Sequence, residues 1–141
     1  MPMTKVYLRK GSTSEHRLAI SDSVHRSLIE VLGIPHDDRF HIFHELEADN
    51  LITAPVAFGL ERRAEAVFIQ LYFGARPVEQ LQELYRVLVA DLVEHTGLER
   101  RDIYLNVVES ASANWWADGR VLNASTGFDE RMAADKVPTV S

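Results

Sequence analysis

The sequence contains no cysteine among its 141 residues, which excludes disulfides, thiol catalysis and thiolate metal sites. Basic residues are also few, because 15 Lys and Arg stand against 21 Asp and Glu and give a net charge of −6. Nucleic-acid binding requires a basic stripe, so this balance argues against a nucleic-acid partner. No apolar run approaches the roughly 18 residues of a membrane span, and the N-terminus has no apolar signal segment. These absences predict a soluble cytoplasmic protein with no membrane partner.

The chain does contain an internal repeat with an offset of 64 residues. The tract LGIPHDDRFHIFHE at 32–45 aligns with TGLERRDIYLNVVE at 96–109. At this offset Asp38 aligns with Asp102, and apolar positions upstream also coincide. Apolar positions that match across several segments indicate a duplication, so the chain is interpreted as two copies of one unit.

Each half of the repeat shows the same order of local patterns. In the first half a β-rich run at 3–9 comes first, and Ser12 followed by Glu15 predicts a capping box at the start of a helix. Apolar residues then recur at helical spacing as far as Gly33, a residue suited to the left-handed conformation at a helix end. A second β-rich run at 39–44 closes the half.

The second half repeats this order. A β-rich run at 66–73 precedes Pro77, which suits the first position of a helix. Leucines at helical spacing follow, Gly97 ends the helix, and a last β-rich run covers 103–108. Because a crossover helix makes the two strands of a unit parallel, each half is predicted to be a right-handed βαβ unit.

Two βαβ units can join into one four-stranded sheet with both helices on one face. The predicted fold is therefore α+β, a duplicated βαβ of the ferredoxin-like kind, with one domain at 1–120 and a tail at 121–141. The other face of the sheet is left uncovered, and an uncovered apolar face requires a partner, so we expect an oligomer. Apolar strand residues are expected on that face: Tyr7, Ile42, Phe68 and Tyr72.

Two segments lie outside the repeat in this interpretation. Residues 46–65 form a connector that is long for a compact domain, a property typical of functional loops. Residues 110–141 are polar and rich in small residues apart from Trp115 and Trp116. The last dozen residues are expected to be disordered or to pack on a neighbouring subunit.

Pro2 is the first candidate for chemistry. Initiator methionine is normally removed before a small second residue, and the mature chain then begins with a secondary amine. Such an amine can act as a general base, a general acid or a nucleophile. Because the first strand follows at once, the amine is expected to be fixed at the sheet edge, where partial burial lowers the pKa of an amine. A chance proline at this position and a retained Met1 are the alternatives.

Arg76 and Asp38 are the next candidates. Arg76 stands directly before Pro77, where a cation opposes the helix dipole, and the repeat has Ser12 at the matching position. Its guanidinium and the nearby backbone N–H groups suit a carboxylate substrate, and a solvated surface arginine is the alternative. Asp38 precedes the second strand. It either forms a turn, like its repeat partner Asp102, or positions or activates a water molecule or a substrate proton.

The remaining residues predict neither a metal site nor a cofactor. The six histidines form no clustered ligand set, and His41 and His44, three apart on a predicted strand, face opposite sides of the sheet. No glycine-rich phosphate loop and no GxSxG elbow occurs. We therefore expect a protein that works without a metal and without a cofactor.

Several features together resemble the tautomerase superfamily, and most closely its malonate semialdehyde decarboxylase branch. In chain order they are Pro2, GIPHDDRF at 33–40, GLERRAEAVFIQL at 59–71, the helix start Arg76-Pro77 and VVESASANWW at 107–116. The resemblance covers about residues 2–120. The combination of Pro2 with GxPxxDR and the VE…NW tract is fairly specific.

The resemblance implies a homotrimer that buries the uncovered sheet faces, removal of Met1, and a cofactor-free reaction on a small carboxylate. By the same resemblance Pro2 is the catalytic amine, Asp38 the active-site aspartate, and Arg76 the arginine that holds the substrate carboxylate. Trp115 matches the tryptophan that lines the pocket.

The sequence departs from the decarboxylase pattern at one position. That branch carries two arginines spaced two apart at this helix start, whereas Gly74 occupies the first position here. With a single cation, the preferred hypothesis is a keto–enol tautomerase of a 2-oxo or enol carboxylate, with Pro2 as the base. A decarboxylase or hydratase of small 3-oxo or unsaturated acids is the alternative, with Arg39 or Arg62 as a source of the second charge. A non-catalytic ligand-binding domain on the same scaffold is the third hypothesis.

Overall fold

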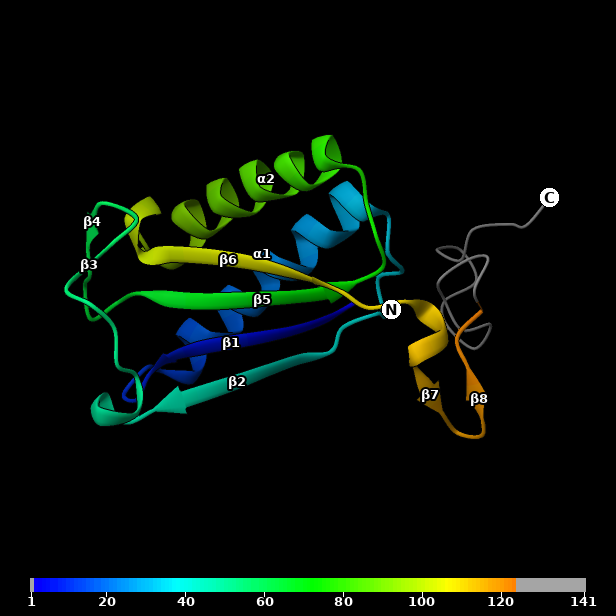
Figure 1. The fold of residues 1–141 in the computed structure, drawn as a ribbon, viewed down its shortest axis with the longest axis horizontal. Coiled ribbons are helices and arrows are strands. Elements are labelled where there is room, and N and C mark those ends of the chain that lie inside the picture. Colours follow the sequence, from blue (N-terminus) through cyan, green and yellow to red (C-terminus); the bar gives the residue numbers. More distant parts are fainter. Residues whose placement is uncertain (1, 124–141) are drawn as a thin grey trace.

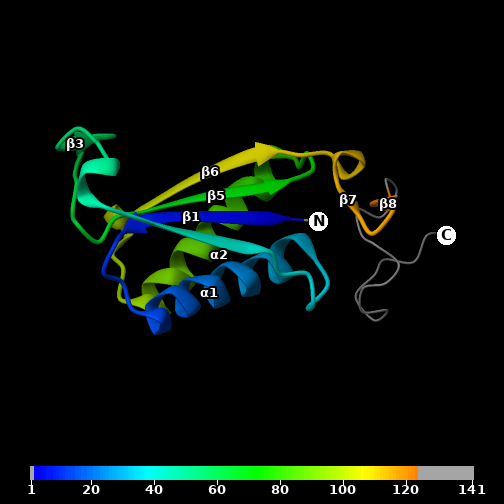
Figure 2. The ribbon, with the colours of Figure 1, turned by 90° about the horizontal axis from the view of Figure 1, so that it is seen from below.

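The structure of the protein is a computed structural model, and it describes residues 2–123. Its centre is one mixed sheet in the order β2-β1-β5-β6. The strands are β1 (Met3–Arg9), β2 (His41–Leu46), β5 (Val67–Phe73) and β6 (Ile103–Glu109). The two long helices, which cover one face of the sheet (Figures 1 and 2), are α1 (Ser14–Leu32) and α2 (Val78–Thr96). The predicted α+β fold with a duplicated βαβ unit is confirmed.

The direction of the strands follows from the two crossover helices. β1 and β2 are parallel, and so are β5 and β6. The two units meet through β1 and β5, which pair antiparallel at the centre of the sheet. Each strand lies within two residues of its predicted range. The largest difference is at β2, which begins at His41 because the preceding residues form a turn in which the Asp38 N–H donates to the Pro35 carbonyl at 3.0 Å.

The start of α1 differs from the prediction, and the capping box of Ser12 and Glu15 is wrong. Thr13 is the N-cap, and its Oγ1 accepts a hydrogen bond from the His16 N–H at 3.0 Å. The Ser12 hydroxyl instead donates to the Glu45 carboxylate on β2 at 3.2 Å. A short polar side chain can therefore bind a neighbouring strand rather than cap its own helix, which local sequence does not reveal.

The start of α2 is shifted by one residue from the prediction. Pro77 is the N-cap, with an extended backbone (φ −58°, ψ 149°), and the helix begins at Val78. Pro77 provides no side-chain hydrogen bond to the first turn. Both helices end as predicted at a glycine in the left-handed conformation, Gly33 (φ 67°) and Gly97 (φ 77°).

The core fills the space between the sheet and the two helices. Alternate residues of the central strands point into it, together with one apolar stripe of each helix. Ten of these side chains are Val6, Leu8, Ile20, Val24, Leu28, Ile69, Leu71, Leu84, Leu88 and Leu92. At the rim, the Arg26 guanidinium on α1 contacts the Asp91 carboxylate on α2 at 2.7 Å.

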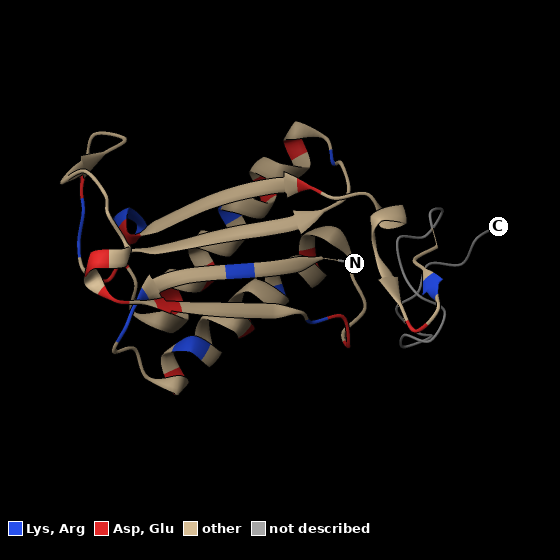
Figure 3. Ribbon diagram, turned by 60° about the horizontal axis from the view of Figure 1, so that its bottom comes forward, with Lys and Arg blue, Asp and Glu red and all other residues tan. Residues whose placement is uncertain are grey.

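The other face of the sheet has no helix over it (Figure 2). Tyr7, Ile42, Phe68 and Tyr72 belong to this face, because the residues that alternate with them point toward the helices. His44 stacks on Tyr7 with ring centroids 4.7 Å apart. Figure 3 shows that few charged residues lie along the four strands. The predicted uncovered and largely apolar face is therefore present.

Each βαβ unit is followed by the same series of short elements. After β2 come η1 (Ala48–Asn50) and a hairpin of β3 (Val56–Ala57) and β4 (Leu60–Glu61). After β6, which η2 (Arg100–Asp102) precedes, come η3 (Ser112–Asn114) and a hairpin of β7 (Trp116–Ala117) and β8 (Arg120–Val121). The structural repeat therefore extends into both segments that were predicted to lie outside it. The sequence did not reveal these hairpins, because strands of two residues carry no periodic pattern.

No helix within residues 2–123 is long and apolar enough to cross a membrane. Met1 and the last dozen residues lie outside the described part of the chain, so the expectations about them stay predictions.

Replacing Leu88 by alanine tests the core. Leu88 is completely buried on α2, so Leu88→Ala is expected to lower the free energy of unfolding by about 2–5 kcal/mol. The measurement is urea denaturation at one fixed protein concentration. Leu18, which is 59% exposed on α1, supplies the control: Leu18→Ala should change stability by less than about 0.5 kcal/mol. Equal effects of the two substitutions would contradict this packing.

Candidate active site

The topology brings the start of β1 and the residues before β2 to one edge of the sheet, meaning here the side on which these two strands begin and not an outer strand. The two strands are parallel and Thr4 pairs with His41, so Pro2 and Asp38 both precede their strands at this edge. The Thr4 N–H donates to the Phe40 carbonyl at 2.9 Å, which fixes the two segments together.

The ends of β5 and β6 reach the same edge. β5 runs antiparallel to β1, and Met3 pairs with Tyr72, so Arg76 follows the strand end beside the start of the chain. β6 is parallel to β5 and leads into η3 and Trp115. Figure 1 shows the start of β1, the end of β5 and η3 at one end of the molecule. Four of the six predicted site residues are therefore gathered at one edge.

Asp38 has an unusual environment for a carboxylate. Only 1% of the residue is exposed, and neither carboxylate oxygen has a hydrogen-bond partner within residues 2–123. Burial raises the pKa of Asp38 to about 6, and the positive charge of the chain's amino terminus acts against this rise. Pro2 is itself buried, and β1 begins at the next residue, so the start of the chain is held in place. The terminus and Asp38 thus interact electrostatically.

Asp102 shows how the repeat treats the equivalent aspartate. It is also completely buried, but Arg63 donates to both of its carboxylate oxygens, from Nε at 2.8 Å and from Nη2 at 3.0 Å. The Glu99 N–H adds a third hydrogen bond at 2.9 Å. Asp102 is a satisfied structural residue, whereas Asp38 keeps both oxygens available. The shared turn position does not explain that difference.

Arg76 is a cation without a carboxylate partner in the described residues. Its Nη1 donates to the carbonyls of Gly74 at 2.9 Å and Ala75 at 3.1 Å, and the guanidinium lies 5.7 Å from the Phe73 ring centroid. A guanidinium has five N–H donors, so further donors remain beside the uncapped first turn of α2. Cation and helix start together suit a carboxylate.

Trp115 forms one wall of this edge. Its ring lies edge-on to the ring of Phe40, with centroids 6.1 Å apart. Phe40 follows Asp38 by two residues. The segment is fixed by hydrogen bonds from the Ser110 N–H to the Phe73 carbonyl and from the Leu122 N–H to the Trp115 carbonyl. The aromatic pair thus joins the segment after β6 to the segment that carries Asp38.

The other two predicted arginines do not join the group. Arg39 follows Asp38 in the chain, but its guanidinium pairs with Asp22 on α1 at 2.7 Å. Arg62 lies at the opposite end of the sheet, 4.9 Å from the Phe68 ring centroid and 4.4 Å from that of Tyr104. Within one chain neither places a second unpaired cation at the candidate site.

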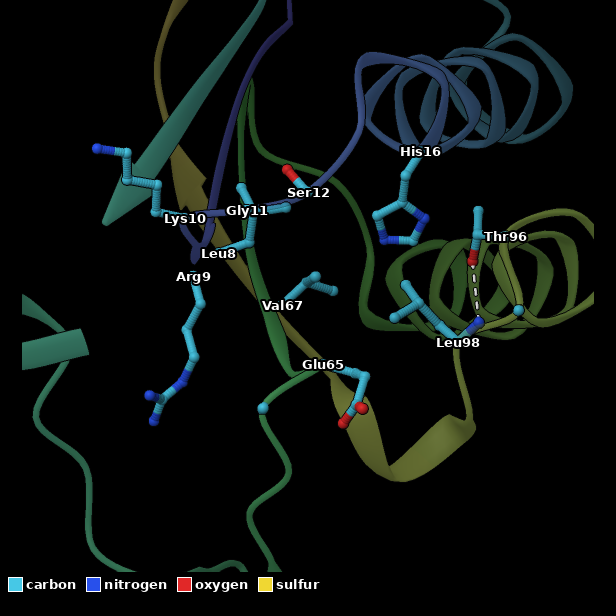
Figure 4. A pocket seen from close by; sticks show the side chains of 12 residues that line it. Leu8, Arg9, Lys10, Gly11, Ser12, His16, Glu65, Val67, Thr96 and Leu98 are labelled. Atoms are coloured by element: carbon cyan, nitrogen blue, oxygen red, sulfur yellow. Dashed lines mark hydrogen bonds between the residues drawn. The ribbon is translucent and has the colours of Figure 1, made fainter. Parts of the chain in front are cut away.

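A pocket of about 390 Å³ lies at the opposite edge, between the end of β1 and the start of β5 (Figure 4). None of the six predicted site residues lines it. Its lining includes Ser12 and Gly97, which are the repeat counterparts of Arg76 and Gly33. The pocket is therefore the second unit's counterpart of the candidate site.

Comparisons with known proteins identify the family of the chain. Two family models, both described as "Tautomerase enzyme", match the chain: one matches residues 38–116 and the other residues 2–61. The probable tautomerase YrdN of Bacillus subtilis (strain 168) is 27% identical over 115 residues, which cover 82% of this chain and 89% of YrdN. The chain belongs to the tautomerase superfamily.

Solved structures show which members of that superfamily the chain resembles. A malonate semialdehyde decarboxylase studied as wild-type, mutant and inactivated enzyme has a TM-score of 0.77 at 23% identity, covering 84% of this chain and 92% of its own. The FG41 malonate semialdehyde decarboxylase has a TM-score of 0.74 at 28% identity, with coverages of 81% and 87%. A fused 4-OT that forms a symmetric trimer shares the fold at 18% identity and a TM-score of 0.68, with coverages of 87% and 98%. The chain resembles the malonate semialdehyde decarboxylase branch, as expected.

Sequence reasoning missed two residues around the aspartates. Arg63 neutralises Asp102, and His25 on α1 places its Nε2 2.8 Å from the His36 carbonyl, two residues before Asp38. A signal for His25 was available: it lies three residues before Leu28 on the buried side of an amphipathic helix. For Arg63, residue type alone does not distinguish a surface charge from an ion pair with a distant strand.

Replacing Asp38 tests its environment through stability. The pKa is about 6 in the folded protein and near 3.8 when unperturbed, so the folded state binds the proton more tightly. This contribution to stability is complete below about pH 4 and is lost as the pH rises through about 6. Asp38→Asn is expected to raise the free energy of unfolding at pH 8 by up to about 3 kcal/mol and to flatten its dependence between pH 4 and 6. Urea denaturation over a pH series measures both.

Asp102→Asn is the matched control from the repeat. It removes a carboxylate that Arg63 and a backbone N–H satisfy, so it should lower stability at pH 8 by about 1–3 kcal/mol. A loss of stability in Asp38→Asn as large as in Asp102→Asn would show that Asp38 is structural.

Proposed function

We propose that the protein is a cofactor-independent keto–enol tautomerase of a small 2-oxo or enol carboxylate. The observation that carries the proposal is the buried Asp38 carboxylate, which keeps both oxygens unpaired at the edge where the chain begins. Arg76 reaches the same edge as a cation without an acidic partner in the described residues. A base, an anion beside it and a carboxylate-binding cation are the groups that such a reaction requires.

In this proposal Pro2 moves the proton. Once Met1 is removed, the neutral Pro2 nitrogen accepts the proton of the enol hydroxyl. The C–O bond becomes a carbonyl, and the electron pair of the C=C bond takes the proton back from the prolinium at the neighbouring carbon. The ionised Asp38 stabilises the transient prolinium, because a nearby anion favours the charged form of an amine.

Arg76 and Trp115 position the substrate in this proposal. The guanidinium of Arg76 holds the carboxylate in a bidentate pair, and the first-turn N–H groups of α2 add dipolar attraction. The half-buried ring of Trp115 limits the access of water to the reacting carbons. Because one chain offers a single unpaired cation here, a monocarboxylate is the favoured substrate class.

A decarboxylase or hydratase of small 3-oxo or unsaturated acids is the second candidate. The similarity to malonate semialdehyde decarboxylases favours it, as do two free oxygens on Asp38 that suit the activation of water. In that reaction Pro2 is cationic and polarises a carbonyl. Arg39 is paired and Arg62 is distant, so a second cation would have to come from another subunit. Activity that falls as Pro2 loses its proton is the signature of this candidate.

A homotrimer is the assembly we propose. The sheet face with Tyr7 and Phe68 has no helix over it, and burial between copies removes its apolar surface from water. No nucleic-acid or membrane partner enters this function, and the cytoplasm remains the predicted compartment. Native mass measurement would detect the trimer.

Pro2→Ala tests the proposed base. The substrate is phenylenolpyruvate, whose ketonisation is followed by the loss of its ultraviolet absorbance, after intact mass has shown that Met1 is absent. Alanine leaves a primary amine in a looser chain end, so kcat/KM is expected to fall at least about 10²-fold, within the range that positioned acid–base groups supply. Unchanged turnover in Pro2→Ala would remove Pro2 from the mechanism.

Arg76→Gln tests the carboxylate contact. The loss of a charged bidentate pair is expected to raise KM for phenylenolpyruvate about 10-fold or more, with a smaller change in kcat. Arg86→Gln on the same helix is the control, because Arg86 is exposed and pairs only with Glu83 among the described residues. A similar KM in both variants would show that Arg76 does not bind the substrate.

A further inference from the structure

One face of α1 holds the segment that carries Asp38 at three points. His25 binds the carbonyl of His36 at 2.8 Å. Asp22 pairs with Arg39 at 2.7 Å. The hydroxyl of Ser21 lies 2.6 Å from Nδ1 of His41. The three contacts fall before, directly after and three residues after Asp38, so the helix fixes the segment on both sides of the aspartate.

The contact of His25 is the most buried of the three. His25 is 6% exposed, and its ring meets the ring of His41 edge-on at 6.3 Å. A carbonyl oxygen can only accept, so Nε2 carries the hydrogen and donates. Burial lowers the pKa of His25 and, together with the charge of Arg39, lowers the pKa of His41 to about 4. Both shifts favour the neutral form of the ring at pH 7.

The carbonyl that His25 binds belongs to the turn that presents Asp38. The Asp38 N–H donates to the Pro35 carbonyl at 3.0 Å, which leaves the His36 carbonyl inside the turn as the point where α1 can hold it. A buried carboxylate without partners gains solvation if its segment moves outward. The hydrogen bond from His25 to the His36 carbonyl opposes that movement, because it is buried and lies two residues before Asp38.

We propose that His25 is a positioning residue that keeps Asp38 buried beside the start of the chain. His25 does not touch the substrate in this proposal and acts only through the turn at 35–38. The catalytic consequence rests on the proposed function, whereas the effect on the Asp38 carboxyl group does not. The two are therefore measured separately.

The test compares His25→Gln with His25→Asn. The amide nitrogen of glutamine can occupy the place of Nε2 and keep the hydrogen bond, whereas that of asparagine overlies Nδ1 and cannot reach the His36 carbonyl. The first readout is the carbon-13 NMR titration of the Asp38 carboxyl group. We expect a pKa near 6 in the wild type and in His25→Gln, and a value closer to 3.8 in His25→Asn, where the carboxylate becomes solvated.

The charged groups that act on Asp38 and on His25 are known from the structure. Asp38 responds to Asp37 and to the amino terminus, and His25 responds to the neighbouring charges of Asp22, His36 and Arg39. None of these is replaced in either variant. A change in the Asp38 titration therefore reports the position of the carboxyl group.

The second readout is the ketonisation of phenylenolpyruvate. His25→Asn is expected to lower kcat about 10- to 100-fold with KM nearly unchanged, because the displaced group is not the one that holds the carboxylate. His25→Gln should restore most of kcat. His95→Asn is the control, since His95 lies on α2 and bonds the Asp91 carbonyl of its own helix rather than this turn.

The outcomes separate the two proposals. An unchanged Asp38 titration in a folded His25→Asn overturns the role of His25, and so does an equal loss in both variants. If the Asp38 titration shifts as expected but Pro2→Ala does not lower the turnover of phenylenolpyruvate, the positioning role of His25 stands and the proposed function fails. If His25→Asn does not fold, His25→Leu replaces it, since leucine keeps an apolar side chain at this buried position but cannot donate to the His36 carbonyl, and it should shift the same titration in the same direction.

Discussion

The antiparallel pairing of β1 with β5 is the constraint on which the rest of this structure depends. It joins the two βαβ units in opposite directions. The starts of the strands of one unit therefore lie at the same edge of the sheet as the ends of the strands of the other. Pro2 and Asp38 precede the two strands of the first unit, whereas Arg76 and Trp115 follow the two strands of the second. No single unit contains all four of these candidate residues, and the pairing of the two units brings them to one edge.

The duplication also shows how one half became different from the other. Asp38 and Asp102 are both buried at equivalent positions, yet only Asp102 is neutralised by a guanidinium. In the second unit Arg63 precedes β5 and neutralises the aspartate. In the proposed mechanism the first unit has the Pro2 amine beside its aspartate instead. The other edge keeps the pocket and fills the aspartate's hydrogen bonds.

The environment of Asp38 links stability to function. A carboxylate without hydrogen-bond partners in the interior destabilises the folded state at neutral pH, since burial favours its protonated form. The sheet and α1 hold it there nevertheless, through the Thr4–Phe40 bond on one side and the histidine contact on the other. A rigid scaffold thus keeps a polar group where water would otherwise draw it out, as expected of positions where activity and stability conflict.

The sequence by itself determined the two units, their strands and helices, and the glycines that end the helices, because these depend on local periodicity and backbone conformation. The residues that resemble the superfamily's motifs also pointed to Pro2, Asp38, Arg76 and Trp115 as candidates, and the structure gathers these four at one edge of the sheet. Tertiary structure decided which charges are satisfied: it pairs Arg39 with Asp22, sends Arg62 to the far edge, and leaves Asp38 and Arg76 without such partners in residues 2–123. It also decided that Ser12 binds a strand and that His25 supports a turn. Such contacts join residues distant in the chain, and the local pattern around a residue does not specify its distant neighbour.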